Sequence, residues 1–128
     1  MLAILLATGI CAAEIPDLLG KWNGSWTSYD EGKGLHKMTE NERIIFNFTK
    51  QDRRIFSGNL TIMLENATIV EESFAGAVGI DNETLYIDEF DGGYALATLT
   101  SKNDIELIYL KDCKNSSIAI DELHRMMI

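Results

Sequence analysis

Two pairs of adjacent acidic residues are the first groups in the chain that could do acid–base chemistry or bind a hard cation. They are Glu71-Glu72 and Asp88-Glu89, and Asp91 follows closely. Paired carboxylates can exchange protons or hold a calcium ion. Adjacent residues of a β-strand point to opposite faces, however, so neither pair can converge on one atom. The segment "DEFDGG" lacks the spacing of a calcium-binding loop. We therefore expect these acids to be solvated at hairpin ends.

His124 and Asp121 form a second candidate pair, because such pairs assist nucleophilic catalysis. No G-x-S-x-G elbow and no glycine loop for an oxyanion accompanies them. His36 and His124 are isolated in the sequence, so no Cys/His cluster has metal-ligand spacing. Cys113 lies in a polar turn between two lysines, where we expect an inert thiol. The sequence therefore predicts a protein that is not an enzyme and has no cofactor or metal.

The motif Asn-x-Ser/Thr is the chemical signal that this chain carries in excess. It occurs six times, whereas eight asparagines and 16 serines and threonines in 128 residues predict about one match by chance. The motif asparagines are Asn23, Asn47, Asn59, Asn66, Asn82 and Asn115. None of the motifs contains proline, so each is a candidate N-glycan acceptor, which requires a secretory route. The alternative is that Asn and Thr are simply common in turns and on strand surfaces.

The N-terminus supports a secretory route. Residues 2–13 form an uncharged apolar run that is too short to span a bilayer and ends in small residues. We predict a signal peptide over residues 1–13, one domain over residues 14–128, and a secreted or cell-surface location. A lipoprotein anchor at Cys11 and an N-terminal core segment are the alternatives. If Cys11 is retained, a bridge to Cys113 is conceivable.

Length and composition indicate one soluble domain with a real core. The chain has 128 residues, of which 46% are hydrophobic, and a formal net charge of -9. Such an acidic chain repels phosphate backbones, so nucleic acid is a poor partner.

Eight short apolar runs about ten residues apart predict the elements that position these groups. The predicted strands cover residues 20–30, 42–50, 54–64, 67–80, 83–90, 94–101, 104–111 and 116–126, with a long polar loop over residues 31–41. Short turns rich in Gly, Asn and Asp separate them, as in an antiparallel meander. A meander of eight strands can close into an up-and-down barrel, so we predict an all-β fold of this kind.

The strand faces agree with the glycosylation motifs. Phe46 and Phe48 alternate with Asn47, and Leu60 alternates with Asn59. A glycan must point outward, so the apolar faces should point inward. A membrane barrel would carry its apolar band outside, where these motifs would lie, and we therefore expect no transmembrane span.

The first predicted strand opens with Gly20-Lys21-Trp22 after an apolar lead-in. This G-x-W resembles the opening motif of the calycins, the group of lipocalins, fatty-acid-binding proteins and avidins. The resemblance implies that Gly20, Trp22 and Arg125 close one end of the barrel, with the arginine packed across the tryptophan. The lipocalin T-D-Y motif and the helical lid of fatty-acid-binding proteins are not found. Both tryptophans, Trp22 and Trp26, lie in the first strand, whereas an avidin-like biotin site would use tryptophans on later strands.

The interior of such a barrel either is filled by side chains or holds one small ligand. Candidate lining residues are Phe46, Phe48, Phe56, Leu60, Ile62, Phe74, Leu107 and Tyr109. We expect most of these to be core, with a pocket at one mouth where small residues such as Gly58, Gly76 and Ala97 leave space. The leading hypothesis is a barrel that binds a small apolar or amphipathic molecule. The alternative is an interaction module with a filled barrel and no ligand. Oligomeric state stays open.

Overall fold

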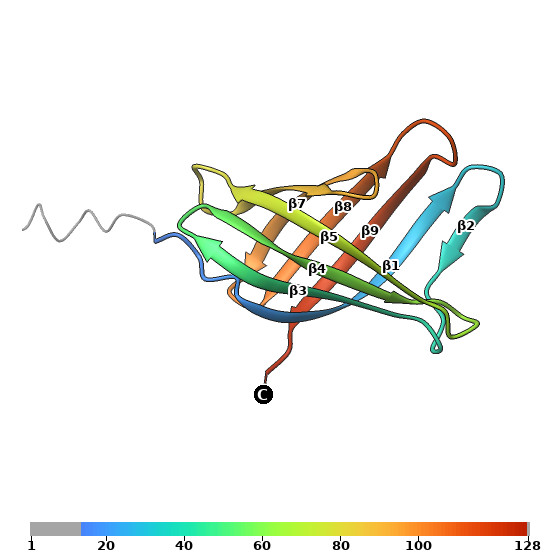
Figure 1. The fold of residues 1–128 in the computed structure, drawn as a ribbon, viewed down its shortest axis with the longest axis horizontal. Helices are drawn as coiled ribbons and strands as arrows, with labels where there is room; N and C mark the ends of the chain where they lie inside the picture. The colour runs from blue at the N-terminus through green and yellow to red at the C-terminus, as the bar shows by residue number, and fades with distance from the viewer. Residues whose placement is uncertain (1–13, 128) are drawn as a thin grey trace, which may run out of the picture.

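The computed structural model describes residues 14–127, which form a closed antiparallel β-barrel (Figure 1). The strands are β1 (Gly20–Asp30), β2 (Gly34–Lys37), β3 (Arg43–Asp52), β4 (Ile55–Met63), β5 (Ile69–Val78), β6 (Thr84–Glu89), β7 (Tyr94–Ser101), β8 (Asp104–Lys111) and β9 (Ser117–Arg125). The eight strands β1 and β3–β9 pair in order, and β1 also pairs with β9 to close the sheet. The predicted eight-stranded barrel is confirmed. The predicted signal peptide, residues 1–13, lies outside the described residues.

The predicted polar loop 31–41 is wrong in one respect, because it contains the short strand β2. The first half of β1 pairs with β3 and the second half pairs with β2, from Thr27↔Lys37 to Asp30↔Gly34. Gly32 and Gly34 have φ angles of 84° and 85°, which only glycine adopts easily, and they allow the tight reversal. Strand β2 therefore extends the wall at one end of the barrel (Figure 1).

The barrel interior is filled by aromatic and aliphatic side chains over most of its length. The rings of Phe48 and Phe74 lie 5.1 Å apart between centroids, and those of Phe48 and Phe56 lie 5.3 Å apart. Alternation is the cause, since inward residues are buried while Asn47 and Asn59 point outward. The prediction that the apolar faces turn inward is confirmed.

Two glycines do not leave space in the interior, contrary to expectation. A Cβ atom at Gly58 would lie 1.9 Å from the Asn47 carbonyl oxygen, and one at Gly76 would lie 2.4 Å from the Phe56 ring. Gly58 pairs with Phe48 beside a register shift in β3. These glycines therefore let neighbouring groups approach closely, and they do not line the cavity inside the barrel.

The two ends of the barrel differ. At one end lie the β3–β4, β5–β6 and β7–β8 turns and the N-terminal lead-in, where Leu18 is fully buried. At the other end lie β2 and the β4–β5, β6–β7 and β8–β9 hairpins; we call this end the mouth (Figure 1). Residues 14–127 contain no helix with the length and hydropathy that crossing a membrane requires.

Candidate functional site

The end opposite the mouth is sealed by Arg125 and Trp22. The Arg125 Cζ atom lies 4.4 Å from the centroid of the fully buried Trp22 ring. The guanidinium also donates to the carbonyl oxygens of Leu19 at 3.0 Å and Asp17 at 2.7 Å. The Trp22 indole N–H donates to the Leu18 carbonyl at 3.0 Å. These contacts tie the lead-in to the last strand and leave the mouth as the end at which a ligand can enter.

A cavity of about 380 Å³ lies at the mouth. Its lining is Trp26, Ser28, Asp30, Lys33, His36, Glu42, Ile44, Leu60, Ile62, Leu64, Glu72, Glu89, Tyr109, Ser117, Ala119 and Asp121. Of the predicted lining residues, Leu60, Ile62 and Tyr109 contribute to it. The others lie deeper, in the packed core: Phe46, Phe48, Phe56, Phe74 and Leu107. The cavity is therefore apolar on its floor and rich in carboxyl groups on its walls.

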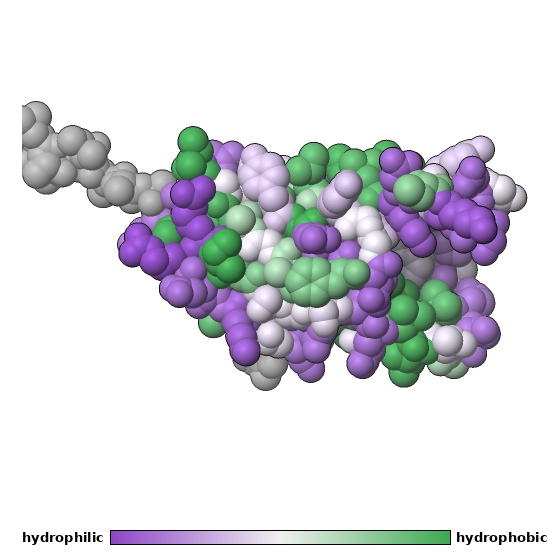
Figure 2. Space-filling model, turned by 45° about the horizontal axis from the view of Figure 1, so that its top comes forward, coloured by the Kyte–Doolittle hydropathy of each residue, from purple (hydrophilic) through white to green (hydrophobic). Residues whose placement is uncertain are grey.

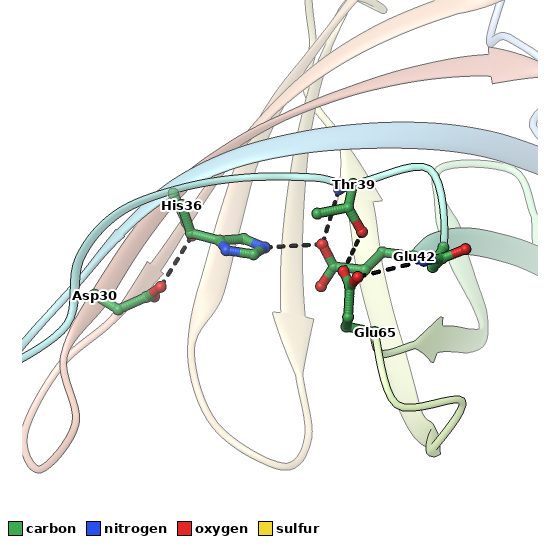
Figure 3. Close-up of polar contacts among 7 residues, drawn as sticks. Asp30, His36, Thr39, Glu42 and Glu65 are labelled. Atoms are coloured by element: carbon green, nitrogen blue, oxygen red, sulfur yellow. Dashed lines mark hydrogen bonds and ion pairs between the residues drawn. The ribbon is translucent and has the colours of Figure 1, made fainter.

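Two of the wall carboxylates have hydrogen-bond partners within the protein. Buried Glu42 accepts from the His36 ring Nε2 and from the Thr39 backbone N–H, both at 2.9 Å (Figure 3). Asp30 accepts from the hydroxyls of Ser117 at 2.6 Å and Ser28 at 3.1 Å. The bonds of Glu42 attach β2 and the following turn to the start of β3, and the Ser117–Asp30 bond joins β9 to β1, so both carboxylates have structural roles.

Glu89 and Glu72 form a pair of carboxyl groups on neighbouring strands. Glu89 is only 4% exposed, and a hydrogen bond joins its side chain to that of Glu72. Burial, followed by the charges of Glu72 and Asp121, raises the pKa of Glu89 to about 8. Burial and then the Asp91 charge raise the pKa of Glu72. The pair therefore retains a proton at neutral pH, since two adjacent buried carboxylates repel each other.

Asp121 is the fifth carboxyl group of the cavity wall, and it has no partner among the described residues. It is 4% exposed and lies on the inner face of β9, between Trp26 of β1 and Leu107 of β8. No hydrogen bond or ion pair from residues 14–127 reaches its carboxyl group. No buried side-chain nitrogen or oxygen in this part of the chain is sealed from solvent without a partner, so the Asp121 oxygens reach the cavity. Burial raises its pKa to about 7.

The expectation that the hairpin-end acids are solvated is therefore wrong for Glu89. The pairing of His124 with Asp121 is also not found, because His124 points outward and its Nδ1 lies 2.5 Å from Asp104 Oδ1. Adjacency in the chain does not reveal how these acids converge. Glu72, Glu89 and Asp121 instead share the inward phase of apolar residues on their own strands, which are Phe74, Ile87 and Leu123. That shared phase was the signal that could have found them.

Few positively charged side chains lie near the carboxyl cluster that Glu72, Glu89 and Asp121 form. Lys33 lines the cavity from the β1–β2 turn, and Lys111 of β8 acts on Glu72. Tyr109 is half-buried, and its hydroxyl donates to the Gly92 carbonyl at 2.8 Å. Burial and then the charge of Glu89 raise the pKa of Tyr109 to about 12, so it stays neutral. The cluster therefore lacks a matching buried cation among residues 14–127.

The six motif asparagines lie on the outer surface or in turns. Asn47 and Asn59 are direct cross-strand partners on β3 and β4. Asn23 is exposed on β1. The others lie in turns, where Asn82 and Asn115 have φ angles of 57° and 60° and Asn66 accepts from the Thr68 backbone N–H. Turn geometry therefore explains part of the asparagine excess, but it does not explain the three asparagines on strands.

The outer face of β6–β9 carries an apolar surface. Tyr86, Leu96, Ile108 and Ile120 are successive cross-strand partners on this face, and three of them are about half exposed. A groove of about 650 Å³ runs along it toward Ile55. The side of Figure 1 that holds β7 comes forward in Figure 2, which shows green apolar surface among purple polar side chains. No motif asparagine lies on the strands of this face.

Comparison with known proteins supports the fold and no family. No family of known proteins matches the chain, and no curated protein matches it. A redesigned β-barrel superposes with a TM-score of 0.67 at 11% identity, over 90% of this chain and 100% of that one. EF1p2_mFAP2b bound to DFHBI gives 0.60 at 12% identity, over 85% and 94% of the chains. An S-type phycobiliprotein lyase from Guillardia theta gives 0.53 at 10% identity, over 87% and 89%. These likenesses define the class as an eight-stranded antiparallel barrel.

Proposed function

We propose that this protein is a calycin-like binding barrel that holds a small amphipathic molecule in its mouth. The observation that carries the proposal is the cavity of about 380 Å³ above a packed aromatic floor. Sites for small molecules are typically concave, about 300–1,000 Å³ in volume, with an apolar lining and a few placed polar groups. One of the structurally similar barrels was solved with a small molecule bound, which supports this use of the fold.

The same proposal includes a secreted or cell-surface location and N-glycosylation. Its support is the position of Asn23, Asn47 and Asn59 on the outside of the barrel, together with the excess of acceptor motifs. The proposal is a binding role and not a catalytic one, because the serine and histidine side chains that line the cavity are already bonded to Asp30 and Glu42.

A blocking substitution tests the binding role. Ala119 lies on the inner face and lines the cavity, whereas its neighbour Ile120 points outward and is 48% exposed. We expect Ala119→Phe to weaken binding at least about tenfold in a titration of aryl and alkyl compounds of about 8–20 heavy atoms. Ile120→Phe is the matched control and should bind as the unchanged protein does. Equal binding by Ala119→Phe, or no binding by the unchanged protein, would contradict the proposal.

A second candidate function follows from the outer face of β6–β9. Its exposed apolar side chains and the absence of acceptor motifs on its strands favour contact with another protein surface. The simplest such contact is self-association, in which two copies of the chain pack through this face. Sedimentation equilibrium should then show a dimer that Leu96→Asp dissociates. A monomer at all concentrations would remove self-association.

A further inference from the structure

We propose that the molecule bound at the mouth carries a positive charge, as an organic ammonium group, and that Asp121 is its counter-ion. This inference rests on the proposed function and names its ligand class. The observation that carries it is a buried carboxyl group that opens onto a cavity and has no partner among residues 14–127.

A buried carboxylate without a partner is unusual. Buried charges in proteins are paired or hydrogen-bonded, because removing an ionised group from water costs several kcal/mol. Asp30 and Glu42, on the same cavity wall, follow this rule through Ser28, Ser117 and His36. Asp121 departs from it, although serine and histidine donors line the same cavity.

Glu72 and Glu89 strengthen the attraction for a cation. The three carboxyl groups are close enough to interact, because the charges of Glu72 and Asp121 both raise the pKa of Glu89. The groups that face these carboxyls from the surrounding elements are Asp30, Lys33, His36, Glu42, Asp91, Tyr109 and Lys111. His36 is engaged by Glu42, and Lys111 acts on Glu72 near the rim. The interior therefore has an excess of negative charge that a bound cation would balance.

The rest of the lining favours an organic cation over a metal ion. No group of three or more His, Cys, Asp or Glu residues in the described part of the chain has an arrangement that could hold a metal. Trp26 is the cross-strand neighbour of Asp121, and Tyr109 lines the same cavity. Aromatic rings beside a carboxylate suit ammonium groups, and Leu60 and Ile62 suit the hydrocarbon that carries them.

Matched compounds separate charge recognition from simple filling of the cavity. The probes are pairs of aryl and alkyl ammonium ions and alcohols of the same shape, such as phenethylamine and 2-phenylethanol, titrated into the full protein by calorimetry at about pH 8. We expect the ammonium ion to bind at least about tenfold more tightly than the alcohol. Asp121→Asn should abolish this preference and still bind the alcohol. Glu122→Gln is the control, since Glu122 is the next residue and points outward.

Each outcome decides the inference. Binding of the alcohols as tightly as the ammonium ions, or an unchanged preference in Asp121→Asn, overturns the charge assignment and leaves the proposed function standing. Binding of neither kind of probe removes the proposed function and the inference with it. Calcium binding that Asp121→Asn abolishes would identify a metal site and also overturn the inference. Proton release on ammonium binding, measured in two buffers of different ionisation enthalpy, is expected only when the carboxyl groups take part.

Discussion

The guanidinium of Arg125 lies over the Trp22 ring, with Cζ 4.4 Å from the ring centroid, although the two residues are more than 100 positions apart in the chain. They are also cross-strand partners, so the contact fastens the first strand to the last. The closure of the barrel and the attachment of the lead-in therefore depend on the same side chain. The G-x-W resemblance implied this pairing, and the geometry of the described chain contains it.

Removal of the Arg125 guanidinium should destabilise the closed end. We expect Arg125→Ala to lower the free energy of unfolding by about 1–3 kcal/mol, because hydrogen bonds to two lead-in carbonyls and a cation–π contact are lost. Arg125→Lys should recover only part of this loss, since an ammonium lacks the planar fork. Urea unfolding measures the change. Arg43→Ala, on the exposed side of β3, is the control; an equal loss there would contradict the special role of Arg125.

Stability should fall as pH rises, because the buried carboxyl groups have raised pKa values. Burial raises the pKa of Asp121 from its ordinary value of 3.8 to about 7 in the folded chain. It raises the pKa of Glu89 from 4.5 to about 8. Between about pH 4 and pH 8 the unfolded chain loses these protons before the folded chain does. The free energy of unfolding should therefore decrease over this range, because the protons that the folded chain retains stabilise it relative to the unfolded chain only while they stay bound.

Thermal unfolding at several pH values measures this decline. Asp121→Asn should flatten the curve between about pH 4 and pH 7, the interval between the unfolded and folded pKa values of Asp121, whereas Glu122→Gln should leave it unchanged. Below about pH 4 the trend should reverse, because hydrogen bonds from Thr84 lower the pKa of exposed Asp81 to about 2. A stability that rises steadily from pH 4 to pH 8 would show that the interior carboxyls are not buried as described.

Gly58 should tolerate no side chain. A Cβ atom there would lie 1.9 Å from the Asn47 carbonyl oxygen, so Gly58→Ala must push β3 and β4 apart. We expect a loss of about 1–3 kcal/mol in the free energy of unfolding. Ser57→Ala, one residue away, should change stability much less. A stable Gly58→Ala variant would mean that the two strands are not so close.

Much of the barrel could be predicted from the sequence, since alternation and turn residues are local signals. The ends of the strands and the inward phase of Phe46, Phe48 and Leu60 followed from them. Strand β2 was missed because its four residues have no run of alternating hydrophobicity and depend on an edge of β1 that β3 leaves free. Gly58 was misread because close approach of Asn47 depends on the register shift in β3.

The carboxyl cluster at the mouth was missed for a different reason. Glu72, Glu89 and Asp121 come from β5, β6 and β9, and closure of the barrel brings them to one cavity. Neighbours in the chain cannot reveal such convergence. The inward phase of each acid does reveal the convergence, once the number of strands and their register are known.

Glycosylation can be tested at a pair of acceptors that face each other. Asn47 and Asn59 are direct partners across β3 and β4, where Cβ atoms are about 5 Å apart. In a secreting eukaryotic host, Thr61→Ala should remove the glycan at Asn59 and raise occupancy at Asn47, because its neighbour no longer competes for space. Thr61→Ser keeps the acceptor motif, so intact-mass analysis should show the same glycan occupancy at Asn47 and Asn59 as in the unchanged protein. An unmodified secreted chain would contradict the proposal.

The two tryptophans allow the most direct test of binding at the mouth. Both lie on the inner face of β1, about 13 Å apart, with Trp22 sealed in the closed end and Trp26 lining the cavity. Protein labelled with 5-fluorotryptophan should give two ¹⁹F resonances, which Trp26→Phe assigns. Titration with phenethylamine and 2-phenylethanol should shift the Trp26 resonance and leave that of Trp22 in place. A shift confined to Trp22, or binding that moves neither resonance, would contradict a ligand site in the mouth of the barrel.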